Sequence, residues 1–189
     1  MELTIPILQE KIKEWKGCVL CKTANAVLGE GNFHADVMFI GEAPGQKEDE
    51  LGRPFVGAAG KFLDELLQSI ELKREDVYIS NVVKYRPPNN RDPLPEEKEQ
   101  CMPWLMMEIA IIQPKVIVPL GRHALQHFFQ KLSMTEAHGK PQKITDTVTI
   151  FPIYHPAAAL HNGNLRQALF DDFRALRVFL DGKNLATDS

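Results

Sequence analysis

The chain has 189 residues, of which 44% are hydrophobic and 25% are charged, with a formal net charge of −3. This balance is typical of one globular domain and excludes a disordered chain or one that needs disulfides to fold. The net charge provides no global basic field, although a local basic patch is enough to hold a nucleic-acid backbone. We expect a single domain over residues 1–189, with residues 1–30 packed on it and a disordered tail at 181–189.

Cellular location is predicted from the cysteines and the apolar runs. Cys18, Cys21 and Cys101 are a sparse, odd set, which argues against a secreted disulfide framework. The N-terminal stretch carries charges throughout, unlike a signal peptide. No apolar run reaches the about 20 residues of a membrane span. We expect a soluble, cytoplasmic, monomeric protein without a membrane partner.

Hydrophobic spacing predicts helices that alternate with short apolar strands. In chain order, the expected elements are a helix over 5–16, a strand over 36–40, a helix over 60–70, a strand over 77–80, a helix over 96–112, a strand over 115–120, a helix over 122–131, a strand over 148–154 and a helix over 165–180. Prolines exclude regular structure from residues 86–95, and residues 133–146 are polar and irregular.

This alternation predicts an α/β fold of three layers, α/β/α, with a central four-stranded parallel sheet. The segments GEAPG, NVVKYRPP, LGRHA and HPAA each follow one of the four strands. Ligands of such sheets bind outside the carboxyl ends of the strands. We therefore expect these four segments to converge on one rim.

The glycine-rich segment over residues 41–60 follows the first strand and contains Glu42, Glu48 and Phe55. It lacks the GxxxxGK[ST] pattern of a phosphate loop, and its acidic charge would repel phosphate. A planar, neutral ligand stacked on Phe55 suits it better. The alternative is a turn with a solvated acidic loop.

Two further side chains of the predicted rim have the chemistry of base recognition. Asn81 offers one acceptor and two donors, which can pair with a nucleobase edge, although an asparagine here also suits a cap or turn. His155 can donate to a leaving-group oxygen near neutral pH. His123 and His127 lie four apart on a predicted helix, where they could bind a metal or form a partly exposed face.

The cysteines also suggest a metal. Cys18 and Cys21 form a Cys-x2-Cys pair, which can direct two thiolates into one site, and Cys101 follows at a distance. Without a fourth ligand, three buried free cysteines remain the alternative.

The motifs GEAPG, GRPFVGAAG, NVVKYRPPNNR, PEE with Cys101 after it, and YHPA resemble in order and spacing those of a family 4 uracil-DNA glycosylase. This family is the iron–sulfur branch of the uracil-DNA glycosylase superfamily, and the resemblance covers about residues 18–180. It implies a parallel four-stranded sheet between helices. It also implies hydrolysis of the N-glycosidic bond of uracil in single- or double-stranded DNA, which leaves an abasic site and begins base-excision repair.

The resemblance implies a role for each matching residue. Phe55 would stack on the flipped uracil, Asn81 would pair with its N3 and O4 edge, and His155 would donate to O2. The residues expected against the base and sugar are Glu42, Ala43 and Gly45, with Glu48 near C5, where it would exclude thymine's methyl group. Uracil leaves as an anion while the sugar becomes cationic, so a carboxylate such as Glu42 can stabilise the sugar. Glu42 is also our candidate for activating water.

Members of this family bind a [4Fe–4S] cluster through four cysteines, and three match at Cys18, Cys21 and Cys101. The fourth position holds Tyr85. A phenol is a rare cluster ligand. The alternatives are a cluster with Tyr85 or water on one iron, a three-iron cluster, another metal such as zinc, or no metal. We expect a cluster that pins the N-terminal segment to the loop over residues 86–101.

The resemblance also points to DNA contacts and to rival functions. Leu160 is the candidate for a wedge in the gap left by the flipped base. Basic residues that could hold phosphates, or be plain surface charges, are Lys84, Arg53, Arg86, Arg91 and Arg166. The rivals are a relative that is covalently trapped on uracil-DNA, a non-catalytic nucleic-acid-binding module, and a flavodoxin-type nucleotide-binding protein.

Overall fold

The computed structural model describes residues 3–183 and 185. Its six-stranded sheet has the order β1-β3-β2-β4-β6-β5. The strands are β1 Glu30–Gly31, β2 Val37–Gly41, β3 Tyr78–Asn81, β4 Val116–Pro119, β5 Gln142–Lys143 and β6 Thr149–Ile150. The central four, β3, β2, β4 and β6, are parallel, which confirms the predicted parallel sheet. Short β1 and β5 add an antiparallel edge on either side.

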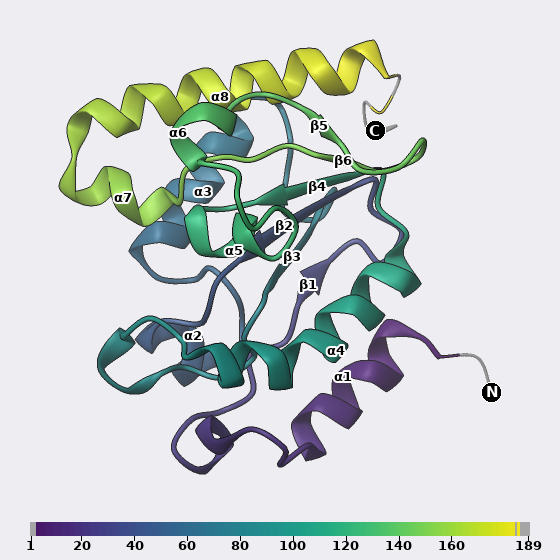
Figure 1. The fold of residues 1–189 in the computed structure, drawn as a ribbon, viewed down its shortest axis with the longest axis vertical. Helices are drawn as coiled ribbons and strands as arrows, with labels where there is room; N and C mark the ends of the chain where they lie inside the picture. The colour runs from purple at the N-terminus through teal and green to yellow at the C-terminus, as the bar shows by residue number, and fades with distance from the viewer. Residues whose placement is uncertain (1–2, 184, 186–189) are drawn as a thin grey trace.

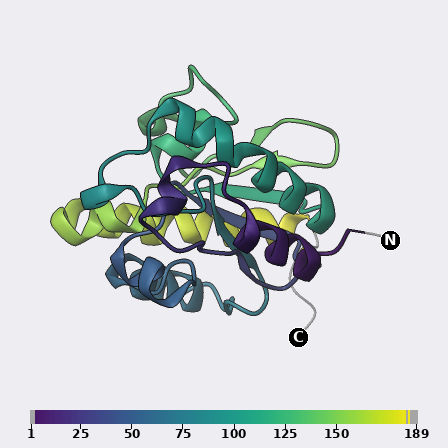
Figure 2. The same cartoon turned by 90° about the horizontal axis from the view of Figure 1, so that it is seen from below.

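Helices cover both faces of this sheet, as Figures 1 and 2 show. The α-helices are α1 Ile5–Glu14, α2 Gln46–Leu51, α3 Ala58–Gln68, α4 Pro95–Ile112, α5 Arg122–Gln126, α6 Met134–Ala137, α7 Pro156–His161 and α8 Gly163–Gly182, and the 3-10 turns are η1 Val19–Lys22 and η2 Pro88–Asn90. Helices α3 and α8 pack on one face, and α1, α4 and α5 pack on the other. The predicted α/β/α layering is thus confirmed.

The composition of β2 explains why both faces need a helical layer. Val37 and Phe39 point into the core that α3 and α8 share, whereas Met38 and Ile40 point into the core under α1 and α4. All four side chains are buried. A strand that is apolar on both sides is stable only between two covering layers.

Several expected boundaries differ from the observed ones. The strand expected over 148–154 shortens to Thr149–Ile150, because Pro119 of β4 has no N–H to donate to the Phe151 carbonyl; beyond it, only an isolated bridge joins Leu120 to Ile153. Within residues 86–95, expected to lack regular structure, lies the turn η2. Within 133–146 lie α6 and β5.

The expected final helix has an additional helix, α7, before it. Asn162 separates the two with extended backbone and caps α8, since its Oδ1 accepts the N–H of Asn164 at 3.1 Å. Helix α8 continues to Gly182, inside the tail predicted to be disordered, and residues 184 and 186–189 of that tail lie outside the described residues. Among the described helices, none is both long and apolar enough to cross a membrane.

Candidate active site

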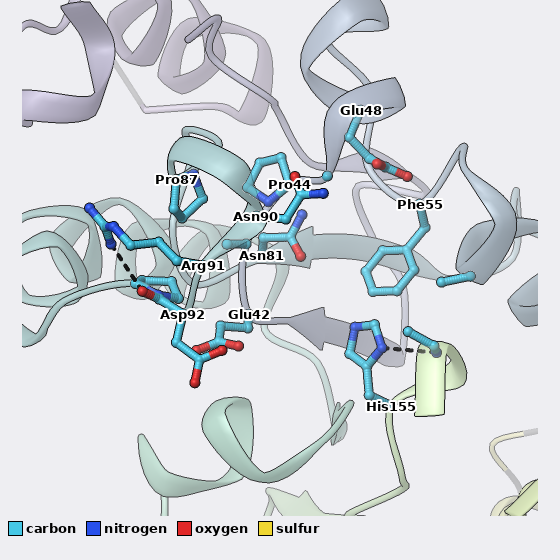
Figure 3. A pocket seen from close by; sticks show the side chains of 15 residues that line it. Glu42, Pro44, Glu48, Phe55, Asn81, Pro87, Asn90, Arg91, Asp92 and His155 are labelled. Atoms are coloured by element: carbon cyan, nitrogen blue, oxygen red, sulfur yellow. Dashed lines mark hydrogen bonds between the residues drawn. The ribbon is translucent and has the colours of Figure 1, made fainter. Parts of the chain in front are cut away.

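The four predicted segments do converge at the carboxyl ends of the parallel strands. Gly41 at the end of β2 pairs with Asn81 at the end of β3. Beside them lies a cavity of about 330 Å³, a size common for small-molecule sites. Figure 3 shows the side chains that line it. Its lining residues are Glu42, Ala43, Pro44, Gly45, Glu48, Phe55, Ala59, Asn81, Pro87, Asn90, Arg91, Asp92, Pro93, His155 and Ala157. Every residue predicted to contact the base or sugar is among them.

Phe55 forms an apolar wall of this cavity in a strained conformation. Its φ is 51°, a left-handed value that bulky side chains rarely adopt. Arg74 holds the segment from outside: Nη1 donates to the Phe55 carbonyl at 2.9 Å and Nη2 to the Pro54 carbonyl at 2.7 Å. A Cβ on Gly60 would collide with the same Phe55 carbonyl, so this position requires glycine. Such enforced strain is typical of ligand-binding segments.

Glu48 fixes the other side of the Phe55 segment. Its Oε1 accepts the backbone N–H groups of Val56 at 2.8 Å and Gly57 at 2.7 Å. The carboxylate therefore ties α2 to the start of α3, with Phe55 between them. Glu48 lines the cavity, but its role against a C5 methyl group stays a prediction.

Asn81 is buried at the end of β3, directly across from Gly41. A Cβ at position 41 would collide with Asn81 Oδ1 and with the ring of Phe55. The glycine of the first motif thus lets the amide and the aromatic ring approach each other closely. An amide in this position can meet the edge of a base that stacks on Phe55.

His155 stands opposite, stacked on Phe55 with ring centroids 5.7 Å apart and an interplanar angle of 28°. Its Nδ1 accepts the backbone N–H of Ala157 at 3.1 Å, at the start of α7. The proton of the neutral ring therefore lies on Nε2. Burial lowers the pKa of His155 to about 4, although the nearby charge of Glu48 opposes this. The ring is a neutral donor at physiological pH.

Glu42 lies on the opposite side of the cavity from Phe55 and His155 (Figure 3). Its Oε1 is 3.2 Å from Lys98 Nζ and 3.5 Å from His123 Nδ1. Burial raises the pKa of the Glu42 carboxyl, whereas the charges of His123 and Lys98 lower it. The residue thus combines partial desolvation with nearby cations, a combination common at functional sites.

The residues predicted to contact phosphates are more scattered over the structure than those predicted to contact the base. Arg91 lines the cavity, where its guanidinium binds Glu97 at 2.6 and 2.9 Å. Arg86 donates to Asn90 at 2.7 Å. The remaining phosphate candidates lie elsewhere: Arg53 pairs with Glu30 and Arg166 with Glu65. Leu160, the candidate for the wedge, is exposed on α7.

Lys84 cannot hold a phosphate, contrary to the prediction, because its side chain is 0% exposed. Its Nζ donates to Glu108 Oε2 at 2.7 Å, to Ser80 Oγ at 2.8 Å and to the Asn81 carbonyl at 2.9 Å. All three ammonium protons are therefore used inside the protein. Lys84 supports the backbone that presents Asn81.

Two of the three cysteines, Cys18 and Cys21, belong to the N-terminal segment, and Cys101 lies in α4. Cys18 and Cys101 are buried and Cys21 is half-buried. Burial raises the pKa of Cys101 to about 12 and also raises that of Cys18, so these thiols hold their protons unless a metal displaces them. In the described part of the chain, three ligand atoms come within 4.8 Å of one another only at Glu42, Asp92 and His123. At least one pair of the three sulfurs is therefore more than 4.8 Å apart, whereas the thiols of Cys18 and Cys101 lie within hydrogen-bonding reach of each other.

Tyr85 is engaged with α1. Its hydroxyl lies 2.9 Å from the Trp15 carbonyl and 3.2 Å from the Ile12 carbonyl, at the C-terminal end of that helix. Burial, with the neighbouring thiols adding to it, raises the pKa of Tyr85 to about 12. A neutral hydroxyl that donates to carbonyls does not fit the role of a metal ligand.

Sequence patterns missed part of the site. Lys98 and Asp92 were not singled out, and His123 was noted only for its spacing from His127. In the structure all three gather at Glu42. The usable signal was the position of LGRHA directly after the third strand, which places His123 at the rim.

Comparison with known proteins agrees with this geometry. A family model described as the uracil DNA glycosylase superfamily matches residues 28–176. The chain is 47% identical to the type-4 uracil-DNA glycosylase of Sulfurisphaera tokodaii, with 95% of this chain and 93% of that one covered. It is 44% identical to that of Saccharolobus solfataricus (98% and 90% covered) and 43% identical to that of Thermotoga maritima (95% and 96% covered). A chain with this site and these relatives belongs to the type-4 branch of the uracil-DNA glycosylase superfamily.

Proposed function

We propose that this protein is a monofunctional uracil-DNA glycosylase, which hydrolyses the N-glycosidic bond of uracil in DNA and leaves an abasic site for base-excision repair. The observation that carries the proposal is the cavity in which Phe55, Asn81 and a neutral His155 meet. Its substrate would be uracil-containing DNA, single- or double-stranded. We further propose that the protein acts as a monomer in the cytoplasm.

In the proposed reaction the target base leaves the DNA stack and enters the cavity, at a cost of a few kcal/mol that is smaller in single strands. Phe55 stacks on the base and Asn81 binds its polar edge. As the glycosidic bond breaks, negative charge grows on the uracil oxygens. The Nε2–H of His155 donates to O2 and stabilises this charge, a contribution of about 3–4 kcal/mol for one well-placed donor.

Glu42 would serve the other side of the breaking bond. The sugar becomes cationic as uracil departs, and a carboxylate beside it stabilises that charge. The same carboxylate can accept a proton from the water that attacks the sugar. The partly buried Glu42, on the cavity wall across from His155, suits both tasks.

The test is alkali-dependent cleavage of a labelled single-stranded oligonucleotide that carries one uracil. We expect breakage only after alkali treatment, because a monofunctional glycosylase makes an abasic site without cutting the strand. A slow band that contains protein would instead identify the covalently trapped relative. An intact oligonucleotide that binds equally well with or without uracil would identify a non-catalytic binding module.

We also propose that Cys18, Cys21 and Cys101 hold an iron–sulfur cluster, with Tyr85 outside its ligand set. Two observations support this: the neighbouring thiols of Cys18 and Cys101 bring the N-terminal segment and α4 together, and the Tyr85 hydroxyl is already bonded to α1. The cluster would be structural and would tie residues 18–21 to α4.

Replacing Tyr85 by cysteine supplies a fourth thiol, so we expect the Y85C variant to retain more iron and sulfide in air than the natural protein. Replacing it by phenylalanine should leave the iron content unchanged and increase hydrogen exchange in α1, whose terminal carbonyls lose their donor. Iron analysis, visible absorbance and hydrogen exchange check these outcomes. Loss of iron in Y85F would show that the phenol is a ligand after all.

A further inference from the structure

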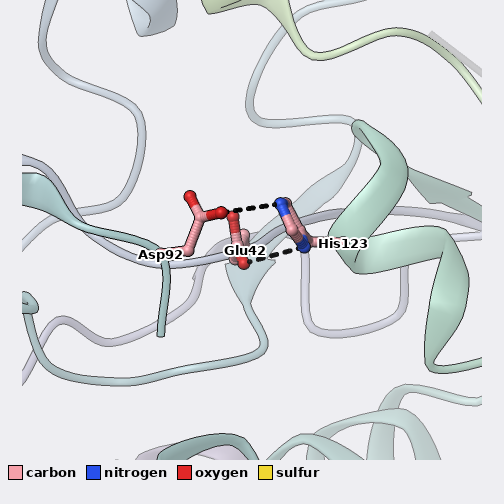
Figure 4. Close-up of side chains that lie close together, drawn as sticks. All are labelled: Glu42, Asp92 and His123. Atoms are coloured by element: carbon pink, nitrogen blue, oxygen red, sulfur yellow. Dashed lines mark ion pairs between the residues drawn. The ribbon is translucent and has the colours of Figure 1, made fainter. Parts of the chain in front are cut away.

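At the cavity wall, Glu42 belongs to a group of charged side chains from separate segments, which we call the Glu42 cluster: Glu42, Asp92, Lys98 and His123. Lys98 reaches Glu42 from α4 and His123 from α5, at 3.2 and 3.5 Å from the same oxygen, Oε1. Asp92 approaches the same imidazole, with Oδ2 3.2 Å from Nε2, and its carboxylate lies within 4.8 Å of the Glu42 carboxylate. Figure 4 shows both carboxylates on the same side of the imidazole, each facing one of its ring nitrogens.

The side chains of the Glu42 cluster differ in burial, and burial determines how strongly each charge acts on the Glu42 carboxylate. The side chains of Glu42 and Lys98 are both 18% exposed, whereas that of Asp92 is 73% exposed. Water and salt screen an exposed charge more than a buried one. Lys98 therefore acts strongly on Glu42, and Asp92 acts weakly.

Other titratable groups near the cluster are already engaged or neutral. Arg122 Nη2 lies 3.2 Å from His123 Nε2, and Arg91 is held by Glu97. Burial lowers the pKa of His127, which directly follows α5, to about 4, and this leaves its ring neutral. His155 and Glu48 face the cavity from its other wall (Figure 3). Lys98 is thus the cation closest to the Glu42 carboxylate.

We infer that Lys98, assisted by His123, is a positioning residue for the reaction, which keeps Glu42 ionised and oriented toward the sugar, while Asp92 works against ionisation. This inference rests on the role proposed above for Glu42. Burial alone raises the pKa of the Glu42 carboxyl, and an adjacent Asp92 raises it further. A protonated Glu42 could neither stabilise a cationic sugar nor accept a proton from water.

Because Lys98 and Asp92 carry opposite charges, removing each one should shift the pH–rate profile in an opposite direction. Removing the Lys98 cation by Lys98→Met should move the acid limb of the pH–rate profile to higher pH, by about one unit or more, with rates recovering at alkaline pH. Removing the Asp92 charge by Asp92→Asn should move the same limb to lower pH. The Asp92→Asn shift should be smaller and should shrink further in high salt.

Single-turnover excision from a uracil-containing single strand, measured from about pH 5 to about pH 9, provides the profile. Lys98→Arg keeps the cation and should behave like the natural protein. Lys47→Met is the matched control, because Lys47 is exposed on α2 and pairs only with Glu50 among the described residues. A Lys98→Met rate that falls by the same factor at every pH would overturn the inference, as would equal directions of shift in the two variants.

Titration of the Glu42 carboxyl by NMR, assigned with Glu42→Gln, provides a readout that does not depend on activity. The carboxyl should titrate at higher pH in Lys98→Met and at lower pH in Asp92→Asn; an unchanged titration contradicts the inference. A natural protein that leaves uracil in place refutes the proposed glycosylase function instead. If the natural protein excises uracil but Glu42→Gln is equally fast, the role of Glu42 fails, and the inference fails with it.

Discussion

Replacing His155 by alanine is expected to lower the rate of uracil excision by about 10²–10³-fold, the usual cost of removing one donor from a site that stabilises a developing anion. The bond between His155 Nδ1 and the Ala157 N–H leaves Nε2 as the donor. With its pKa lowered to about 4, the ring does not change charge from about pH 5 to pH 8, so the loss should be similar across this range.

Single-turnover rates measure this loss without interference from product release. The control is His34→Ala, because His34 is exposed and lies outside the cavity. Both variants should be compared at a temperature where each is folded. A His155→Ala protein within a factor of about three of the natural rate would remove His155 from the mechanism.

Replacing Lys84 by methionine is expected to destabilise the fold by about 3–5 kcal/mol, because it leaves the buried Glu108 carboxylate without its cation. The side chains of this pair are 0% and 1% exposed, and their bond is 2.7 Å long. The same ammonium holds the Asn81 carbonyl. Excision should therefore also slow in the fraction that remains folded.

Urea unfolding provides the measurement. Lys115→Met is the matched control: it breaks a 2.9 Å pair with Asp36 whose side chains are 54% and 36% exposed, which should cost about 1 kcal/mol or less. The double variant with Lys84→Met and Glu108→Met removes both charges and should recover most of the lost stability. A Lys84→Met protein as stable as the Lys115→Met protein would contradict the buried-pair explanation.

The sheet and the cavity rim could be predicted from the sequence because their signals are local. Four apolar strands, each followed by a motif, place Glu42, Asn81 and His155 at one edge of a parallel sheet, and the structure brings these residues into one cavity. The two-residue strands β1 and β5 are too short to show any periodicity. Helix α7, Pro156–His161, has only six residues, too few to show a hydrophobic period, and it begins with a proline, which also suits a turn.

The missed features depend on contacts between residues far apart in the chain. Lys84 was assigned to the surface because it is charged, and only its contact with Glu108, 24 residues later, makes its burial possible. The strained backbone of Phe55 is held by Arg74, 19 residues away. His123 and Lys98 meet Glu42 only through the packing of α4 and α5 on the same face of the sheet.

The most direct test of the central claim is the release of free uracil from a uracil-containing single strand by the natural protein and by the Asn81→Ala variant. Asn81 is the buried amide at the end of β3, so its loss removes the group proposed to bind the base edge. We expect the natural protein to release uracil and Asn81→Ala to be slower by at least about tenfold. Equal rates for the two proteins, or no uracil from either, would contradict the claim that this cavity excises uracil.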